Sequence, residues 1–109
     1  MGTSVHGIRW TDAVEYAAFM IAREAIGNAV RHAEASRVKV SLDGNADHLC
    51  LRVEDDGKGI KPDDLQGRPG HLGMVGMRER AEAIGAQLVV ARGPAGGTVV
   101  ELTREVPAP

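Results

Sequence analysis

The sequence predicts an α/β fold in two layers, with a mixed and largely antiparallel sheet covered by helices on one face. Three observations support this. A long amphipathic helical stripe fills the first third of the chain, two pairs of strand-like runs follow it, and a shorter helical segment separates the pairs. Strands that follow each other through short turns pair as hairpins, so most of the sheet is expected to be antiparallel.

Length and composition limit the size and the partners of the protein. A chain of 109 residues has room for one domain, predicted over residues 1–109, with residues 1–10 as an N-terminal arm or an artificial start. Aromatic residues make up only 3% of the chain, so the core must be built from aliphatic side chains. A net charge of -2 argues against nucleic acid as a partner, because such binding depends on neutralising phosphates. The sequence contains no apolar run of about 18 residues, so no membrane span is predicted.

The first helix is predicted over residues 12–34. Thr11 is a suitable N-cap, and Asp12 and Glu15 place negative charge in the first turn, where it suits the helix dipole. The apolar residues that recur with the helical period form one broad stripe: Val14, Ala18, Ile21, Ala22, Ala25, Ile26, Ala29 and Ala33.

Two hairpins and a second helix follow. The first hairpin pairs alternating runs around residues 38–42 and 49–53, with a turn predicted at 43–47. After a loop at 57–73, the second helix is predicted over 74–84, ended by Gly85. The last two strands are predicted at 87–92 and 98–104.

Glu24 and Asn28 stand one turn apart on the first helix, and Arg31 follows on the same face. The spacing separates Glu24 and Asn28 by about 40° around the helix, at the edge of the apolar stripe. An amide oxygen is a hard ligand suited to Mg²⁺, and a carboxylate one turn away can accept a proton. The alternative is a solvated helix edge with an Arg–Glu pair, which is common on exposed helices.

Residues 55–59 read Asp-Asp-Gly-Lys-Gly and follow directly on the second strand. Asp55 continues the inward apolar face of that strand, where a carboxylate needs a donor such as the amino group of adenine. Gly57 and Gly59 allow the backbone to approach a flat ring. The alternative is an ordinary Asp-Gly turn.

Gly70, Gly73 and Gly76 recur every three residues before the second helix. Small residues let a loop fold onto the helix N-terminus, whose free N–H groups bind phosphate. Neither the P-loop pattern nor the dinucleotide-binding pattern occurs in the chain. Residues 96–98, Gly-Gly-Thr, open the last strand. Taken singly, the glycine-rich segment and the Gly-Gly-Thr segment indicate a mobile loop and a turn. Together with residues 24–28 and 55–59, they are the parts needed to hold ATP and Mg²⁺.

In their order and spacing, the four segments resemble the nucleotide-binding motifs of the Bergerat-type ATP-binding superfamily. That superfamily includes DNA gyrase, the ninety-kilodalton heat-shock chaperones, MutL and the sensor histidine kinases, and the resemblance covers about residues 14–105. Residues 23–33 (Arg-Glu-Ala-Ile-Gly-Asn-Ala-Val-Arg-His-Ala) and 76–81 (Gly-Met-Arg-Glu-Arg-Ala) look most like the catalytic domain of bacterial histidine kinases of the nitrate-sensor and DesK class. The short lid at 61–72 also fits this class. The resemblance implies the Bergerat ATP-binding fold, an α/β sandwich with a mixed sheet.

The resemblance also assigns roles to single residues. Glu24 would be the catalytic base, Asn28 would bind Mg²⁺, and Asp55 would bind the adenine amino group. The other residues implied to bind the nucleotide are Arg31, His32, Gly57, Gly59, Ile60, His71, Gly73, Met74, Val75, Gly76, Met77 and Thr98. The implied cofactors are ATP and Mg²⁺.

The implied reaction is transfer of the ATP γ-phosphoryl to a His on a separate dimerisation domain. That phosphoacceptor domain is expected to be absent from this chain, because no histidine precedes the first helix on a helical hairpin; the four are His6, His32, His48 and His71. The implied partners are this dimerisation domain and, through the full-length kinase, a response regulator. The full-length protein is expected to be a homodimer, cytoplasmic or the cytoplasmic part of a membrane-anchored sensor.

Two alternatives stay open. An anti-sigma-factor serine kinase is a short single domain of the same superfamily, which the length of the chain favours. A nucleotide-binding regulatory module without transfer activity is opposed by the intact Glu24 and Asn28. Residues 76–80, Gly-Met-Arg-Glu-Arg, favour the histidine kinase.

Overall fold

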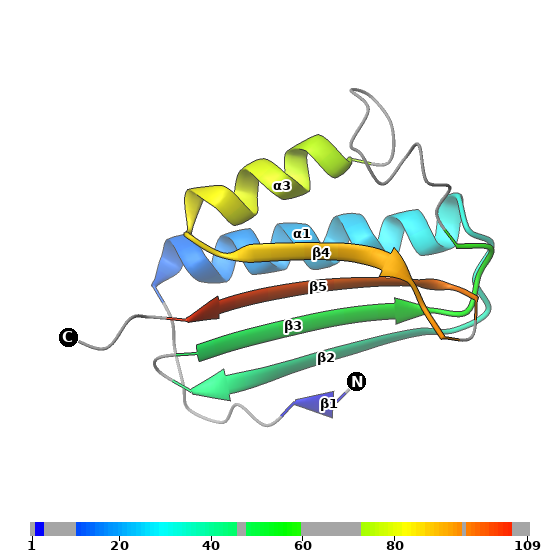
Figure 1. Cartoon of the computed structure of the whole chain (residues 1–109), viewed down its shortest axis with the longest axis horizontal. Helices are drawn as coiled ribbons and strands as arrows, with labels where there is room; N and C mark the ends of the chain where they lie inside the picture. The colour runs from blue at the N-terminus through cyan, green and yellow to red at the C-terminus, as the bar shows by residue number, and fades with distance from the viewer. Residues whose placement is uncertain (1, 4–10, 46–47, 60–72, 95, 106–109) are drawn as a thin grey trace.

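The computed structural model describes residues 2–3, 11–45, 48–59, 73–94 and 96–105, whose elements form a sheet with two helices on one face (Figure 1). In chain order the elements are β1 (Gly2–Thr3), α1 (Asp12–Arg31), β2 (Val38–Asn45), β3 (His48–Asp55), α3 (Met74–Ala83), β4 (Gln87–Arg92) and β5 (Thr98–Glu105). The strands lie in the order β1-β2-β3-β5-β4. β1 is parallel to β2 and every other pair is antiparallel, which confirms the predicted fold class.

Helix α1 begins as predicted and ends three residues early. The Thr11 hydroxyl accepts a hydrogen bond from the backbone N–H of Val14 at 3.3 Å, which caps the first turn. At the other end, the N–H groups of His32 and Ala33 both donate to the carbonyl of Asn28. Glu34 then takes a left-handed backbone with φ 53°, so the chain leaves the helix and turns towards β2.

The predicted turn of the first hairpin is too long. β2 continues through Asp43 and Gly44 to Asn45, which pairs with His48 across the hairpin. Asp43, Gly44 and Asn45 favour turns, but each pairs with a residue of β3 and so belongs to the strand. Gly44 adopts the φ of 143° that the strand has there, which a glycine accommodates. The connecting residues 46–47 lie outside the described residues.

Helix α3 is bounded by glycine at both ends. Gly73 is its N-cap, in a left-handed conformation with φ 65°. At the C-terminus the N–H of Ala86 donates to the carbonyl of Ala81, and that of Gly85 donates to the carbonyl of Glu82. This is a Schellman motif with Gly85 in the left-handed position, so the predicted stop at Gly85 is confirmed.

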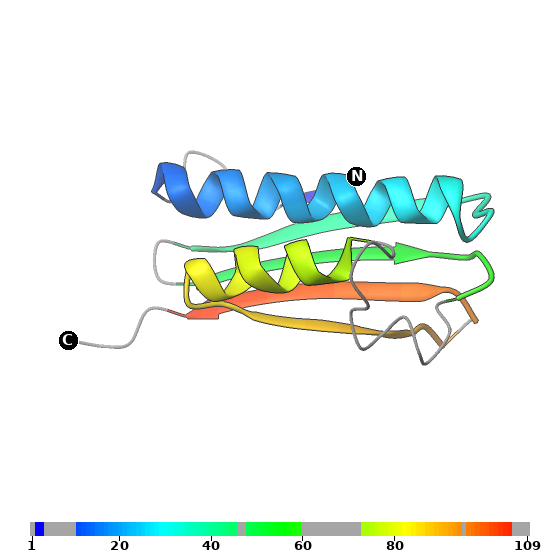
Figure 2. The same ribbon diagram turned by 90° about the horizontal axis from the view of Figure 1, so that it is seen from above.

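The core lies between the helices and the sheet. Figure 2 shows α1 and α3 side by side over the same face of the sheet. The buried side chains between them are aliphatic or methionine, as predicted: Val14, Ile21, Ala25, Leu49, Leu51, Val53, Met74, Met77, Ala81, Val90, Val100 and Leu102. Neither helix in the described part of the chain is long and apolar enough to cross a membrane.

The other face of the sheet is polar at its centre. Arg52 of β3 forms ion pairs with Glu54 on its own strand, at 3.4 Å, and with Glu101 on the neighbouring β5, at 3.3 Å. The apolar face of the sheet therefore lies against the helices, and the candidate site lies at one end of this layer.

Candidate functional site

One end of the molecule gathers the segments that the sequence singles out. The C-terminal half of α1, the end of β3, the start of β5 and the end of β4 meet there, with the N-terminus of α3 above them (Figure 1). The predicted site residues of residues 24–32, 55–59, 73–77 and 98 therefore come from four separate elements that share this end. Ile60 and His71, and the lid at 61–72, lie outside the described residues.

Asp55 is a half-buried carboxylate at the end of β3, and its orientation is set by the backbone. Its Oδ1 accepts hydrogen bonds from the N–H of Gly57 at 2.8 Å and from the N–H of Thr98 at 3.3 Å. A Cβ at Gly97 would collide with the Asp55 carbonyl oxygen, so only glycine lets the start of β5 come this close. The carboxylate is thereby fixed between β3 and β5 by local contacts on both strands.

Thr98 is a buried polar residue beside Asp55. It is 5% exposed, and its hydroxyl has no hydrogen-bond partner among the residues that the structure describes. A buried hydroxyl without a partner costs free energy, which a ligand that supplies the missing bond would recover. Asp55 and Thr98 thus form an adjacent polar pair where β3 ends and β5 begins.

Arg92 is a residue of this end that the sequence analysis missed. It pairs with Thr98 across β4 and β5, so its side chain leaves the sheet on the same face. Its Nε lies 3.3 Å from the position of a Cβ at Gly59, which places the arginine against the glycine loop. The signal in the sequence is its spacing of two from the buried Val90, which puts a cation on the inward face just before a turn.

The residues of α1 divide between the interior and the surface. Asn28 is only 8% exposed, so it lies within the buried face rather than at the edge predicted for it. Glu24 reaches across to the start of α3, where its carboxylate occupies the space that a Cβ on Gly73 would take. Arg31 and His32 are exposed, and the Arg31 guanidinium lies along Gly27, with Nη2 2.6 Å from the position of a Cβ there.

The start of α3 offers backbone groups rather than side chains. The N–H of Met77 bonds to the Gly73 carbonyl, whereas those of Met74, Val75 and Gly76 precede the first intrahelical bond. The side chains of Met74 and Met77 are 0% and 1% exposed and belong to the core. The roles predicted for these two methionines are therefore limited to their backbone. Val75 is exposed, and a Cβ at Gly76 would meet no atom within 4 Å in the described residues.

Replacing Gly73 with alanine is expected to lower the free energy of unfolding by roughly 1–2 kcal/mol, because an L-residue is strained in the left-handed region. The new methyl group would also push Glu24 away from the start of α3. Urea unfolding followed by circular dichroism measures the loss. Gly76→Ala is the matched control, expected to raise stability by roughly 0.5–1 kcal/mol, because Gly76 lies within the helix and a Cβ there would meet no atom of the described residues within 4 Å. Equal stabilities of the two variants would contradict the strain assigned to Gly73.

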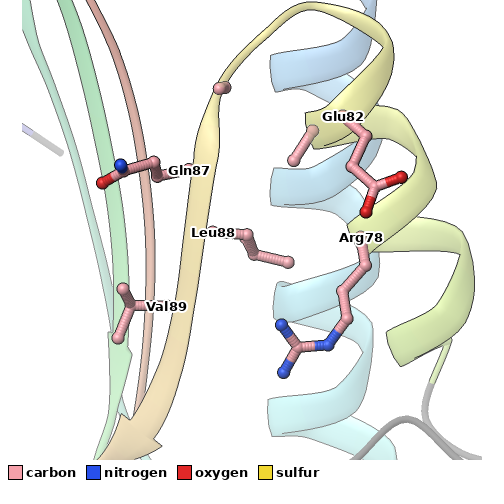
Figure 3. A pocket seen from close by; sticks show the side chains of 7 residues that line it. Arg78, Glu82, Gln87, Leu88 and Val89 are labelled. Carbon is pink, nitrogen blue, oxygen red and sulfur yellow. The ribbon is translucent and has the colours of Figure 1, made fainter.

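A hollow of about 380 Å³ lies between the second half of α3 and β4. Figure 3 shows Arg78 and Glu82 on α3 at one side of it and Leu88 of β4 directed towards the helix from the other side. Gln87 and Val89 at its margin point to the other side of β4 (Figure 3). None of the residues that line this hollow belongs to the predicted site, so it is a separate feature.

Comparison with known proteins gives a consistent picture. The family model described as "Histidine kinase-, DNA gyrase B-, and HSP90-like ATPase" matches residues 13–108. The histidine-protein kinase/phosphatase DegS of Brevibacillus brevis is 35% identical over 94 residues, which cover 86% of this chain and 24% of that protein. The nitrate/nitrite sensor protein NarX of Escherichia coli is 40% identical over 83 residues, 76% of this chain and 14% of that protein. This chain thus spans a quarter or less of these two curated relatives.

Solved structures agree with the fold. The histidine kinase domain of a blue-light activated histidine kinase from Erythrobacter litoralis has a TM-score of 0.68 and 31% identity, over 86% of this chain and 45% of that one. The ATP binding domain of PrrB from Mycobacterium tuberculosis has a TM-score of 0.71 at 24% identity, over 85% of this chain and 69% of that one. The second likeness concerns the fold alone.

Proposed function

Since this chain belongs to the family of histidine kinase-, DNA gyrase B- and HSP90-like ATPases, we propose that it is the ATP-binding catalytic domain of a two-component sensor histidine kinase. The observation that carries the proposal is the oriented Asp55 carboxylate together with the adjacent Thr98 hydroxyl, which has no hydrogen-bond partner among the described residues. The kinase names of the relatives favour a histidine over a serine acceptor.

Adenine would bind where β3 ends and β5 begins, on the face of the sheet that the helices cover. Both backbone hydrogen bonds of Asp55 go to Oδ1, so Oδ2 would accept the exocyclic amino group of the ring. The Thr98 hydroxyl would supply the neighbouring polar contact, and Arg92 would lie at the rim of the pocket. Guanine carries a carbonyl oxygen in place of that amino group, so the same carboxylate would reject it.

The phosphates would extend from adenine towards α1 and the start of α3. The N–H groups of Met74, Val75 and Gly76 and the helix dipole favour anions there. The Asn28 amide oxygen suits Mg²⁺, which takes its remaining ligands from phosphate and water. The metal would neutralise phosphate charge during transfer. Arg31 and His32 are exposed at the end of α1 and would lie near the phosphates.

Glu24 is the group that we assign to the chemical step. An imidazole nitrogen of the acceptor His would attack the γ-phosphorus, ADP would leave, and Glu24 would accept the proton that the imidazole loses. The acceptor would lie on the dimerisation domain of the kinase, and a response regulator would then receive the phosphoryl group. We also propose that the full-length protein is a homodimer. Residues 1–109 would form one domain, and this domain would act in the cytoplasm, where ATP is available.

The chain is expected to bind ATP with an affinity that falls on removal of Mg²⁺. Isothermal titration calorimetry with a non-hydrolysable ATP analogue, with Mg²⁺ and then with EDTA, measures both effects. ADP should bind as well, because adenine and the first phosphates make most of the contacts. Asn28→Ala should reduce the difference between the Mg²⁺ and EDTA titrations, since its oxygen is the assigned ligand. No heat and no thermal shift at millimolar nucleotide would overturn the proposed function.

A further inference from the structure

Two loops beside the site are tied together by a residue outside the predicted site. One loop, residues 32–37, joins α1 to β2, and the other, residues 56–59, follows β3. The Asp56 Oδ1 accepts hydrogen bonds from the N–H of Ser36 at 2.8 Å and from the N–H of Arg37 at 2.9 Å. The Asp56 N–H donates back to the Arg37 carbonyl at 3.3 Å. Three hydrogen bonds from one residue therefore hold the two loops in register.

Other hydrogen bonds between the same two loops connect the two ends of the candidate site. The N–H of Ala33 donates to the carbonyl of Asn28 at 3.1 Å, and the N–H of Lys58 donates to the carbonyl of Ala33 at 2.9 Å. Gly57, between Asp56 and Lys58, donates to the Asp55 carboxylate. A path of hydrogen bonds, which ends on the Asp55 side chain, thus runs beside those of Asp56 from Asn28 on α1 to the end of β3.

The approach of the two loops is close and requires glycine. A Cβ at Gly57 would collide with the carbonyl oxygen of Ala33, so no side chain separates the loops there. Such close contact transmits a displacement of one loop directly to the other, because packed backbone has little room to yield. The Asp56 carboxylate accepts the two hydrogen bonds from Ser36 and Arg37 that join the same loops beside this contact.

The charges at the contact differ in their importance. The hydrogen bond from the backbone N–H of Arg37 lowers the pKa of Asp56, with a further contribution from the Ser36 N–H, so the carboxylate is charged and accepts both bonds at neutral pH. Lys58 and Glu34 form an ion pair at 2.8 Å between side chains that are 64% and 72% exposed. Ion pairs between such exposed side chains contribute little to stability. The hydrogen bonds to backbone groups, and not this ion pair, therefore hold the two loops together.

We propose that Asp56 is a positioning residue for nucleotide binding, which holds Asn28 and Asp55 at the separation that one Mg²⁺-bound nucleotide needs. The inference rests on the proposed function. Asp56 itself does not touch the ligand. Its side chain ties the metal-binding end of α1 to the adenine-binding end of β3 through the loops at 32–37 and 56–59.

The test compares Asp56→Ala and Asp56→Asn with Lys58→Ala by titration with AMP and with Mg²⁺-bound ATP analogue. Asp56→Ala is expected to weaken binding of the Mg²⁺-bound ATP analogue roughly 10- to 100-fold, the range typical for loss of a residue that orients a metal ligand, and to affect AMP binding much less. The gain in affinity from AMP to ATP should therefore shrink. General destabilisation of the fold would instead leave that ratio unchanged.

The other two variants show whether the effect depends on the hydrogen-bond acceptor of Asp56 or on the charges of Asp56 and Lys58. Asp56→Asn should return to within about threefold of the wild type, because its amide oxygen can accept the same two backbone hydrogen bonds. Lys58→Ala should match the wild type, because its N–H to Ala33 is kept. Circular dichroism checks folding, and if Asp56→Ala is unfolded, Asp56→Ser, which keeps one acceptor, takes its place with an intermediate loss expected.

The outcomes are distinct. A wild-type AMP-to-ATP ratio in folded Asp56→Ala, or an Asp56→Asn variant as weak as Asp56→Ala, would overturn the positioning role while leaving the proposed function intact. Failure of the wild type itself to bind the ATP analogue would instead overturn the proposed function.

Discussion

Replacing Glu24 with glutamine is expected to slow phosphoryl transfer by about 10²- to 10⁴-fold, the range typical of a general base, while ATP binding stays nearly unchanged. Glutamine keeps the size of the side chain, so it still fits against Gly73 at the start of α3. It cannot accept a proton from the attacking imidazole, and that interaction exists only in the transition state.

The measurement uses the kinase's own dimerisation domain as the acceptor, supplied in trans or in the full-length protein. Single-turnover labelling from radioactive ATP gives the rate of transfer, and calorimetry gives the affinity. Glu79→Gln is the matched control, because Glu79 is an exposed carboxylate on α3 and lies outside the assigned site. Transfer at the wild-type rate by Glu24→Gln would remove Glu24 from the chemistry and leave a domain that acts by positioning alone.

Replacing Asp55 with asparagine is expected to weaken ATP binding by about 1–3 kcal/mol, which is roughly 5- to 150-fold. The amide oxygen of asparagine can still accept the N–H groups of Gly57 and Thr98, so the loop geometry is preserved. The amide NH₂ then takes the place of Oδ2 and points a donor at the adenine amino group, which is itself a donor. The variant therefore tests the base contact and not the fold.

Calorimetry with ATP and GTP analogues measures the effect. The wild type should prefer adenine strongly, and Asp55→Asn should lose most of that preference. Asp43→Asn is the matched control, because Asp43 also accepts a backbone N–H, that of Gly44, but lies near the far end of β2. Equal competition by GTP in the wild type would show that Asp55 does not read the base.

Local sequence signals predicted the elements well where short-range chemistry sets them. The start of α1 at Thr11 and the end of α3 at Gly85 depend on a side-chain cap and a left-handed glycine, and both are confirmed. The turn at 43–47 was predicted too long, because the ladder between β2 and β3 outweighs the turn preference of Asp43 and Gly44.

The candidate site divides in the same way. The sequence by itself determined which chemical groups are present and on which elements they lie, because the helical spacing of Glu24 and Asn28 and the strand spacing that leads to Asp55 are local properties. Only the tertiary structure decided how these groups meet: Glu24 against Gly73, Thr98 beside Asp55, and Asp56 across to Ser36 and Arg37. Those contacts join residues 19 to 49 positions apart. The packing of α1 against α3 brings Glu24 to Gly73, and the pairing of β3 with β5 and with β2 brings the other residues together, so no local preference decides these contacts.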